Sequence, residues 1–317
     1  MTTILPIASG KGGVGKTLFT TNLGVALASM GKTVVLIDLD LGGSNLHTCL
    51  GIKNMHRGIG NLIYKQEPNL QALLVDTEIK RLHFVPGDSL LPGTANLNFF
   101  VKQKIIRGIE KLMADYILLD LGSGTSYDTL DFFLISSAGI VVTIPETTAI
   151  LNAYSFLKSS IFRMLYRSFR PRSPARQIIR YYLTQRMEGT ERSVADLIET
   201  LSQDSAESGV IAKQQLMAFL PRVVVNITKG RNDQILGSRL GEIVSRNLNF
   251  DLEYLGFLDQ DSNVPNSVLQ RKPLFLTNRT SPYCRSIDQI VYKLINKNRA
   301  ANSPSLFDLD DEQPTIT

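Results

Sequence analysis

The sequence lacks tryptophan and has only two cysteines, Cys49 and Cys284, which lie far apart in the chain. Two distant cysteines exclude a disulfide framework and a CxxC metal or redox pair. No apolar run reaches the roughly 18 residues of a membrane-spanning helix, and the opening MTTILPIA has no basic region of the kind that starts a signal peptide. We therefore expect a cytoplasmic protein that is neither secreted nor integral to a membrane.

What is present is a normal globular composition, with 43% hydrophobic and 20% charged residues in 317. This length allows one large domain or two ordinary ones, with a sizeable core. The net charge of +5 is small for the chain, so it matters only where it is concentrated.

A glycine-rich stretch, SGKGGVGKTL, follows the short apolar run ILPIA. Gly10, Gly15, Lys16 and Thr17 fit G-x-x-x-x-G-K-[ST], the phosphate-binding loop, and apolar residues at helical spacing follow from Thr17 to Met30. In such a loop Lys16 neutralises the outer phosphates and the Thr17 hydroxyl ligates Mg²⁺. Backbone N–H groups at the start of a helix add partial positive charge. The residues expected to contact phosphate are Gly10, Gly12, Gly13, Val14, Gly15, Lys16, Thr17 and Leu18.

A second lysine, Lys11, directly follows the first glycine. The loop KGGVGKT therefore resembles the deviant Walker A signature of the MinD/ParA family of ATPases. The resemblance implies ATP and Mg²⁺ as cofactors and an ATP-dependent homodimer in which Lys11 reaches the phosphates of the partner. Leu18 departs from the family, where a second Thr or Ser is frequent at this position.

Acidic residues follow two further apolar strands. The segment DLDLGGSNLHTCLG resembles the switch I region of the family, which implies that Asp38 lies in the magnesium shell and that Asp40 positions the attacking water. The segment YILLDLGSG resembles Walker B and switch II, which places Asp120 near the metal and Gly122 beside the γ-phosphate. On this resemblance Lys11, Lys16 and Asp40 are the catalytic residues, and Thr17, Asp38 and Asp120 the metal site.

The adenine base is expected farther along the chain. Asn226, at the end of RVVVNITKG, matches the asparagine that reads adenine in the family, and an amide can donate and accept at once. Asparagine is also common in turns, so a structural role stays open. Asp259 and Asp261 resemble a late loop of the family beside the base.

Apolar runs alternate with helical patterns, which predicts an α/β fold: one doubly wound, mostly parallel sheet with helices on both faces. We expect strands near residues 3–8, 33–38, 81–86, 115–121, 139–145, 220–227 and 253–258. Residues 1–298 are expected to form a single P-loop ATPase domain with a helical insertion at about 159–219. A final helix is expected at about 282–298, and the acidic segment 299–317 is expected to be a disordered tail.

Positive charge is concentrated from Thr147 to Met187, which has no acidic residue. Its basic residues are Lys158, Arg163, Arg167, Arg170, Arg172, Arg176, Arg180 and Arg186. Apolar residues from Phe156 to Phe169 recur between them, as in a basic amphipathic helix. Such a helix packs its apolar stripe on the parent sheet, or binds an acidic protein partner through the region 153–187, anionic lipid at the inner face of the membrane, or nucleic acid.

The segment IPETTAILNAYSFLK resembles FlhG-type members of the family, which restrict flagellar number and placement. We therefore expect a slow, partner-regulated ATPase that acts as a dimerisation switch and controls the placement of a cellular structure such as the flagellum or the division site. A DNA-binding partition ATPase is the first alternative. A metabolic or iron–sulfur-carrier ATPase is the second, although Cys49 and Cys284 do not offer a cluster site.

Overall fold

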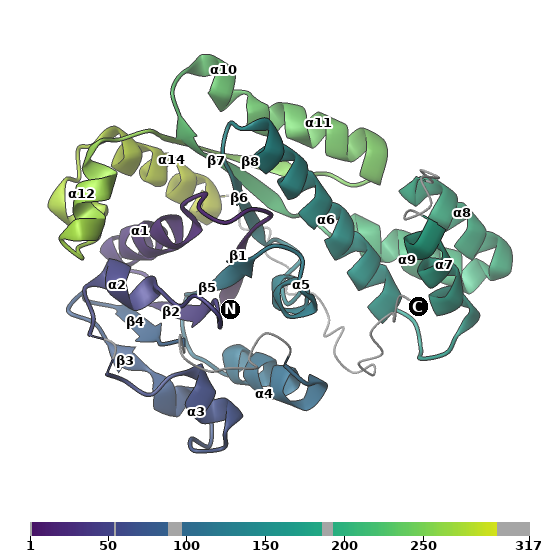
Figure 1. The fold of residues 1–317 in the computed structure, drawn as a ribbon, viewed down its shortest axis with the longest axis horizontal. Helices are drawn as coiled ribbons and strands as arrows, with labels where there is room; N and C mark the ends of the chain where they lie inside the picture. Colours follow the sequence, from purple (N-terminus) through teal and green to yellow (C-terminus); the bar gives the residue numbers. More distant parts are fainter. Residues whose placement is uncertain (1, 54, 88–96, 186–192, 297–317) are drawn as a thin grey trace.

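The computed structural model describes residues 2–53, 55–87, 97–185 and 193–296. These residues form an eight-stranded sheet with helices on both sides (Figure 1). In spatial order the strands are β3 (Val75–Asp76), β4 (Leu82–Val85), β2 (Val34–Leu39), β5 (Tyr116–Ser123), β1 (Thr3–Ser9), β6 (Ile140–Thr143), β7 (Arg222–Thr228) and β8 (Glu253–Asp259). All neighbours are parallel except β3, which is antiparallel to β4.

Both faces of the central strands are apolar, which is why the sequence shows nearly continuous hydrophobic runs there. Leu5 and Ile7 of β1 belong to one core, whereas Ile4 and Ala8 belong to the other. The predicted doubly wound α/β fold is therefore confirmed, and each predicted strand is present within a few residues.

The two faces carry different helices. One core is built with α1 (Lys16–Ser29), α2 (Leu46–Leu50), α13 (Leu274–Thr277) and α14 (Pro282–Asn296). The other is built with α3 (Ile59–Ile63), the 3₁₀ helix η1 (Leu70–Leu73), α4 (Phe99–Glu110), α5 (Tyr127–Phe133), α6 (Thr147–Arg167), α7 (Pro174–Gln185), α8 (Val194–Asp204), α9 (Ala206–Ala218) and α11 (Leu236–Leu248). Two short helices follow the last two strands: α10 (Arg231–Gln234) and α12 (Asn263–Leu269).

The predicted start of the insertion, at about residue 159, falls inside α6, which continues without a break from Thr147 to Arg167. Helix α6 contacts β1 and β6 of the parent sheet, and α7, α8 and α9 follow it as a helical group (Figure 1). The limits of the insertion thus stay a prediction. Helix α14 ends at Asn296, and residues 297–298 and the predicted tail 299–317 lie outside the described residues.

The expected exposed basic face is wrong for Arg163 and Arg167 of α6, which are only 4% and 2% exposed. Arg176, which follows in α7, is 2% exposed. Arg170 and Arg172 are exposed, while Arg186 lies outside the described residues. The packing of the apolar stripe on the parent sheet is confirmed, because Phe156, Leu157 and Ile161 lie in the core below β1. Within the described ranges, no helix combines the length and apolar character required to cross a bilayer.

Candidate functional site

The glycine-rich loop lies where β1 ends and α1 begins, at the carboxyl edge of the sheet. Strand β1 sits between β5 and β6, so the chain leaves it toward β2 on one side and later returns to β6 on the other. In open α/β sheets, ligands bind at such a reversal of strand order. The loop therefore occupies the expected ligand position of this fold.

Two glycines of the loop are required by close approach. A Cβ on Gly10 would collide with the backbone carbonyl of Asn152 in α6. Gly15 has a φ of +83°, and a Cβ there would collide with the amide of Asn226. The loop thus lies between α6 and the end of β7, with Gly12 and Gly13 exposed and Val14 buried.

Helix α1 begins at Lys16, and no described side chain caps it. The first N–H groups of a helix have no partner within the helix, so those of Lys16, Thr17 and Leu18 are available to an anion at the loop. An uncapped helix start that faces a glycine-rich loop fits a phosphate group.

The carboxylate of Asp120 binds three polar residues at the start of α1. Its Oδ1 lies 2.7 Å from Lys16 Nζ, and its Oδ2 accepts a 2.7 Å hydrogen bond from Thr17 Oγ1. Thr20 Oγ1 also donates to Oδ1, at 3.1 Å. Lys16 and Asp120 are both buried, so this contact is a buried ion pair.

Asp38 lies beside Asp120, because the two residues pair across β2 and β5. Its Oδ2 accepts hydrogen bonds from Ser44 Oγ at 2.6 Å and from the N–H of Leu46 at 3.1 Å, and its Oδ1 accepts one from the N–H of Asp40. Burial and the charge of Asp120 raise the pKa of Asp38 to about 7 despite these bonds. Asp38 is thus fixed in place by the segment that follows β2.

Asp40 faces Gly122 across the same edge. Its Oδ1 is 3.5 Å from the point that a Cβ on Gly122 would occupy, and Thr129 Oγ1 of α5 is 3.6 Å from that point. Burial raises the pKa of Asp40, whereas the charge of Lys16 lowers it. Asp40, Gly122 and Thr129 therefore converge beside the lysine.

The buried ammonium of Lys16 pairs with Asp120 and acts on the charge of Asp40, while Asp38 lies beside Asp120, so three carboxylates stand near one ammonium at this edge. This excess of negative charge suits a divalent cation. Within the described ranges, no group of three or more His, Cys, Asp or Glu side chains could hold a metal ion by itself. Mg²⁺ commonly uses one or two protein oxygens together with phosphate oxygens and water, so the residues present fit Mg²⁺ bound with a nucleotide.

Lys11 is held within its own chain. Its Nζ lies 2.8 Å from Glu146 Oε2 and 3.3 Å from Thr148 Oγ1, at the start of α6. The side chains of Lys11 and Glu146 are 38% and 56% exposed. The lysine thus stands at the open side of the loop, paired with groups that solvent can reach.

A cleft of about 560 Å³ lies at the ends of β7 and β8, lined by Thr228, Lys229, Gly230, Gln234, Asp259, Gln260 and Ser262. Asn226 lies beneath the loop, where its Nδ2 donates to the carbonyl of Val14 at 2.8 Å and its Oδ1 accepts from the N–H of Ile227. Its amide thus supports the loop in this structure, and its contact with adenine stays a prediction. Asp259 lines the cleft, whereas Asp261 accepts hydrogen bonds from Asn263.

The structure brings six of the predicted site residues together at the loop: Lys16, Thr17, Asp38, Asp40, Asp120 and Gly122. It also shows contacts of residues for which the sequence predicts no role. Ser44 lies in the segment DLDLGGSNLHTCLG, and Glu146 and Thr148 lie in IPETTAILNAYSFLK, but neither motif predicts a role for them. Thr20 and Thr129 follow the loop and β5 at distances that no motif marks.

Comparison with known proteins shows the family and the fold of the chain. Residues 5–274 match the family described as the CobQ/CobB/MinD/ParA nucleotide binding domain. The flagellum site-determining protein YlxH of Helicobacter pylori is 26% identical over 93% of this chain and 83% of its own length. The septum site-determining protein MinD of the same organism is 35% identical, but the match covers only 48% of this chain and 57% of that protein. A solved structure of MinD from Pyrococcus horikoshii, complexed with Mg-ADP, covers 94% of this chain and 98% of its own, with a TM-score of 0.65 at 18% identity, which shows a shared fold.

Proposed function

The chain belongs to the CobQ/CobB/MinD/ParA family of nucleotide-binding domains, and on that premise we propose that it is a slow ATPase whose subunits pair around Mg-ATP and separate after hydrolysis. The observation that carries this proposal is the arrangement beneath the uncapped start of α1. There, one buried lysine and three carboxylates meet at the glycine-rich loop. Phosphate oxygens suit the helix start, and a divalent cation suits the carboxylates.

The residues of the loop and of the neighbouring strand ends have distinct roles in the proposed reaction. The N–H groups from Gly10 to Leu18 cradle the phosphates, and Lys16 neutralises the outer ones. Bound Mg²⁺ would neutralise the charge that develops on the phosphates, held by Thr17 and oriented by Asp38 and Asp120. Asp40 positions the attacking water beside Gly122, and Asn226 and the cleft at the ends of β7 and β8 lie on the side where the base would bind.

Lys11 links hydrolysis to pairing. In the single chain it contacts Glu146, and in the proposed dimer it reaches the phosphates of the partner's nucleotide instead. ATP drives pairing only if it binds the dimer more tightly than the single chain, because a ligand without preference shifts no equilibrium. Lys11 supplies that preference, since its contact with phosphate exists only in the dimer.

For the cellular role we favour control of the placement or number of a structure such as the flagellum or the division site. The support is the similarity to a flagellum site-determining protein along nearly the whole chain. A protein partner would then bind near the region 153–187, where Arg170 and Arg172 are exposed. Peripheral contact with the membrane is compatible with this role.

The structure supports a DNA-binding role less well than the sequence does. Arg163, Arg167 and Arg176 are buried and cannot reach DNA phosphates. An iron–sulfur role is also less supported. Cys49 and Cys284 are both buried, and burial raises the pKa of each thiol, which disfavours the thiolate that binds iron.

The test uses the purified full chain with Mg²⁺ and a slowly hydrolysed ATP analogue. Light scattering after size-exclusion chromatography should give the mass of one chain without nucleotide and of two with it, and phosphate release should require Mg²⁺. A protein that binds no adenine nucleotide, or that stays single when saturated with it, would contradict the proposal.

A further inference from the structure

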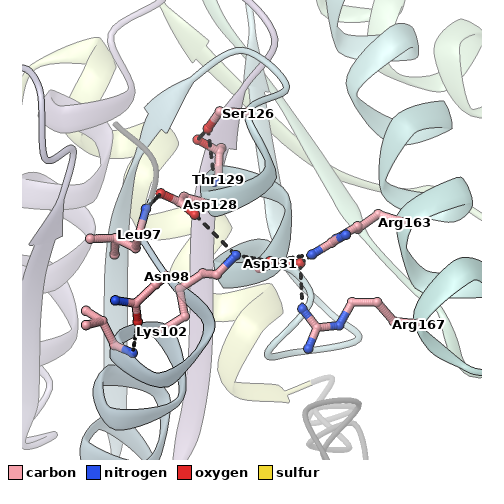
Figure 2. Close-up of polar contacts among 10 residues, drawn as sticks. Leu97, Asn98, Lys102, Ser126, Asp128, Thr129, Asp131, Arg163 and Arg167 are labelled. Carbon is pink, nitrogen blue, oxygen red and sulfur yellow. Dashed lines mark hydrogen bonds and ion pairs between the residues drawn. The ribbon is translucent and has the colours of Figure 1, made fainter. Parts of the chain in front are cut away.

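Five buried charged residues form a cluster between α4, α5 and α6 (Figure 2). We call it the Asp131 cluster: Lys102 of α4, Asp128 and Asp131 of α5, and Arg163 and Arg167 of α6. Three cations and two carboxylates meet there, and the side chain of Asp131 is 0% exposed. The phosphate chemistry described above uses none of these residues.

Asp131 is the centre of the cluster. Arg163 donates to it as a fork, with Nε 2.7 Å from Oδ1 and Nη2 2.8 Å from Oδ2. Arg167 Nη1 lies 3.0 Å from Oδ1, and Lys102 Nζ lies 2.8 Å from Oδ2 (Figure 2). One carboxylate on α5 therefore binds both neighbouring helices.

Asp128 makes further contacts from the same face of α5. Its Oδ1 lies 3.3 Å from Lys102 Nζ, and its Oδ2 accepts a 2.7 Å hydrogen bond from the N–H of Leu97, just before α4. Residues three apart share one face of a helix, so Asp128 and Asp131 fix α5 along its length.

Apolar side chains at these five positions would stabilise the fold at least as well as the Asp131 cluster does. A buried ionic group commonly stabilises a fold no more than hydrophobic side chains of the same volume do. A two-bond arginine–carboxylate fork differs from apolar packing in being directional, so it fixes the angle and the register of the two helices. The cluster is therefore suited to hold α5 in one position.

That position matters because α5 begins directly after switch II. Ser126 caps α5, and its hydroxyl accepts a hydrogen bond from the N–H of Thr129. Thr129 Oγ1 and Asp40 Oδ1 then lie 3.6 and 3.5 Å from the point that a Cβ on Gly122 would occupy. A rotation or slide of α5 would carry Thr129 and the switch II turn away from Asp40.

We propose that Asp131 is a positioning residue for phosphate chemistry: through the Asp131 cluster it fixes α5 against α6 and α4 and so holds Thr129 and Gly122 beside Asp40. This inference rests on the proposed ATPase function, because it assigns Asp131 an effect on the hydrolytic step. Asp131 acts only through α5 and contacts no reacting group.

The test compares three variants of the full chain. Asp131→Asn keeps the shape and removes the charge, and Arg163→Lys keeps the charge and removes the fork. Leu201→Ala, in the buried face of α8, is the control for lost stability far from the phosphates. The kcat and KM for ATP, the Kd for an ATP analogue and the melting temperature are measured for each, at a temperature where all are folded.

A positioning role predicts that Asp131→Asn and Arg163→Lys lower kcat by about ten- to a hundredfold, because a shift of about 1 Å in catalytic groups has effects of this size. The Kd for the analogue should stay within about threefold of wild type, since the loop and Lys16 are intact. Leu201→Ala should lower the melting temperature and leave kcat within about twofold.

Folded variants of Asp131 and Arg163 that keep the wild-type kcat would overturn the inference and leave the ATPase function standing. If Asp131→Asn does not fold, Arg163→Lys decides the question alone. A wild-type protein that binds no ATP would overturn the proposed function and, with it, this inference.

Discussion

The ammonium group of Lys11 lies 2.8 Å from the carboxylate of Glu146 in the same chain. The two side chains are 38% and 56% exposed, and an ion pair so open to water contributes only about 0–1 kcal/mol. Lys11 is therefore held in a defined place by a contact that a phosphate group can replace at little cost. This suits a residue that contacts a carboxylate of its own chain before pairing and the phosphates of the partner's nucleotide after pairing.

Replacing Lys11 tests whether its ammonium group contacts the phosphates of the partner's nucleotide. As a single chain, Lys11→Ala should bind ATP with nearly unchanged affinity, because Lys16 and the helix start remain. It should lose on the order of 10³ in hydrolysis rate, as when a cation that stabilises the transition state is removed. Phosphate release at saturating ATP measures this, with Lys80→Ala, an exposed lysine at the opposite edge of the sheet, as the control. A fully active Lys11→Ala would argue against this contact.

Lys16 should behave differently, because its charge lies inside the loop. Lys16→Ala removes a charge-assisted bond to phosphate and should weaken ATP binding by about ten- to a hundredfold. The same change removes the buried partner of Asp120, so some loss of melting temperature without nucleotide is expected as well. Titration calorimetry with an ATP analogue measures the affinity, and wild-type affinity in this variant would rule out the assigned contact.

Asp40 should affect turnover more than binding. Asp40→Ala leaves the loop, Thr17 and Asp120 in place, so ATP and Mg²⁺ should still bind and bring two chains together. Without the carboxylate beside Gly122 the water is not positioned, and the pair should persist for as long as ATP is present. Size-exclusion chromatography with ATP gives the outcome; a variant that elutes as a single chain would contradict the assigned role.

A fall in pH should lower the free energy of unfolding, partly because Asp131 becomes protonated. Burial by itself would raise the pKa of Asp131, but the hydrogen bonds from Arg163 and the charges of Arg163, Arg167 and Lys102 outweigh it and lower the pKa from 3.8 to about 2. A carboxylate whose pKa is lowered by folding stabilises the folded state at every pH above its pKa in the unfolded chain. This stabilisation is lost as the pH falls from about 4 to about 2.

A shift of this size corresponds to about 2 kcal/mol in the free energy of unfolding. Asp131→Asn should therefore be less stable than wild type at neutral pH, and the difference should shrink as the pH falls below about 4. Urea unfolding at several pH values, followed by circular dichroism, measures both. Parallel pH profiles of the two proteins would contradict the assigned environment of Asp131.

Much of the fold and of the phosphate site could be predicted because the signals are local. Strand β2 is an apolar run that ends in Asp38, and the loop before α1 is one continuous motif. Parallel strands place such ends at one edge, so the convergence of Asp38, Asp40 and Asp120 followed from the fold. Strand β3, with two residues, is too short to leave a periodic pattern.

The contacts that sequence reasoning missed join residues far apart in the chain. Lys11 and Glu146 are separated by 135 positions, and Asp131 and Arg163 by 32. Arginines between apolar residues of α6 resemble an exposed basic face, and only the packing of α5 against α6 shows that they are buried. One signal was available: Asp131 interrupts the apolar run LDFFLI, where an isolated carboxylate needs a buried cation.

Helix α6 spans 21 residues, from its contact with Lys11 to the turn that leads into α7. A straight helix of this length is a rod of about 32 Å, so tilting one end by about 5° displaces the other by about 3 Å. The fork from Arg163, near the far end of α6, to Asp131 of α5 opposes such a tilt. Helix α6 thus sets the distance between the α7–α9 group and Lys11, which contacts the opposite end of this helix.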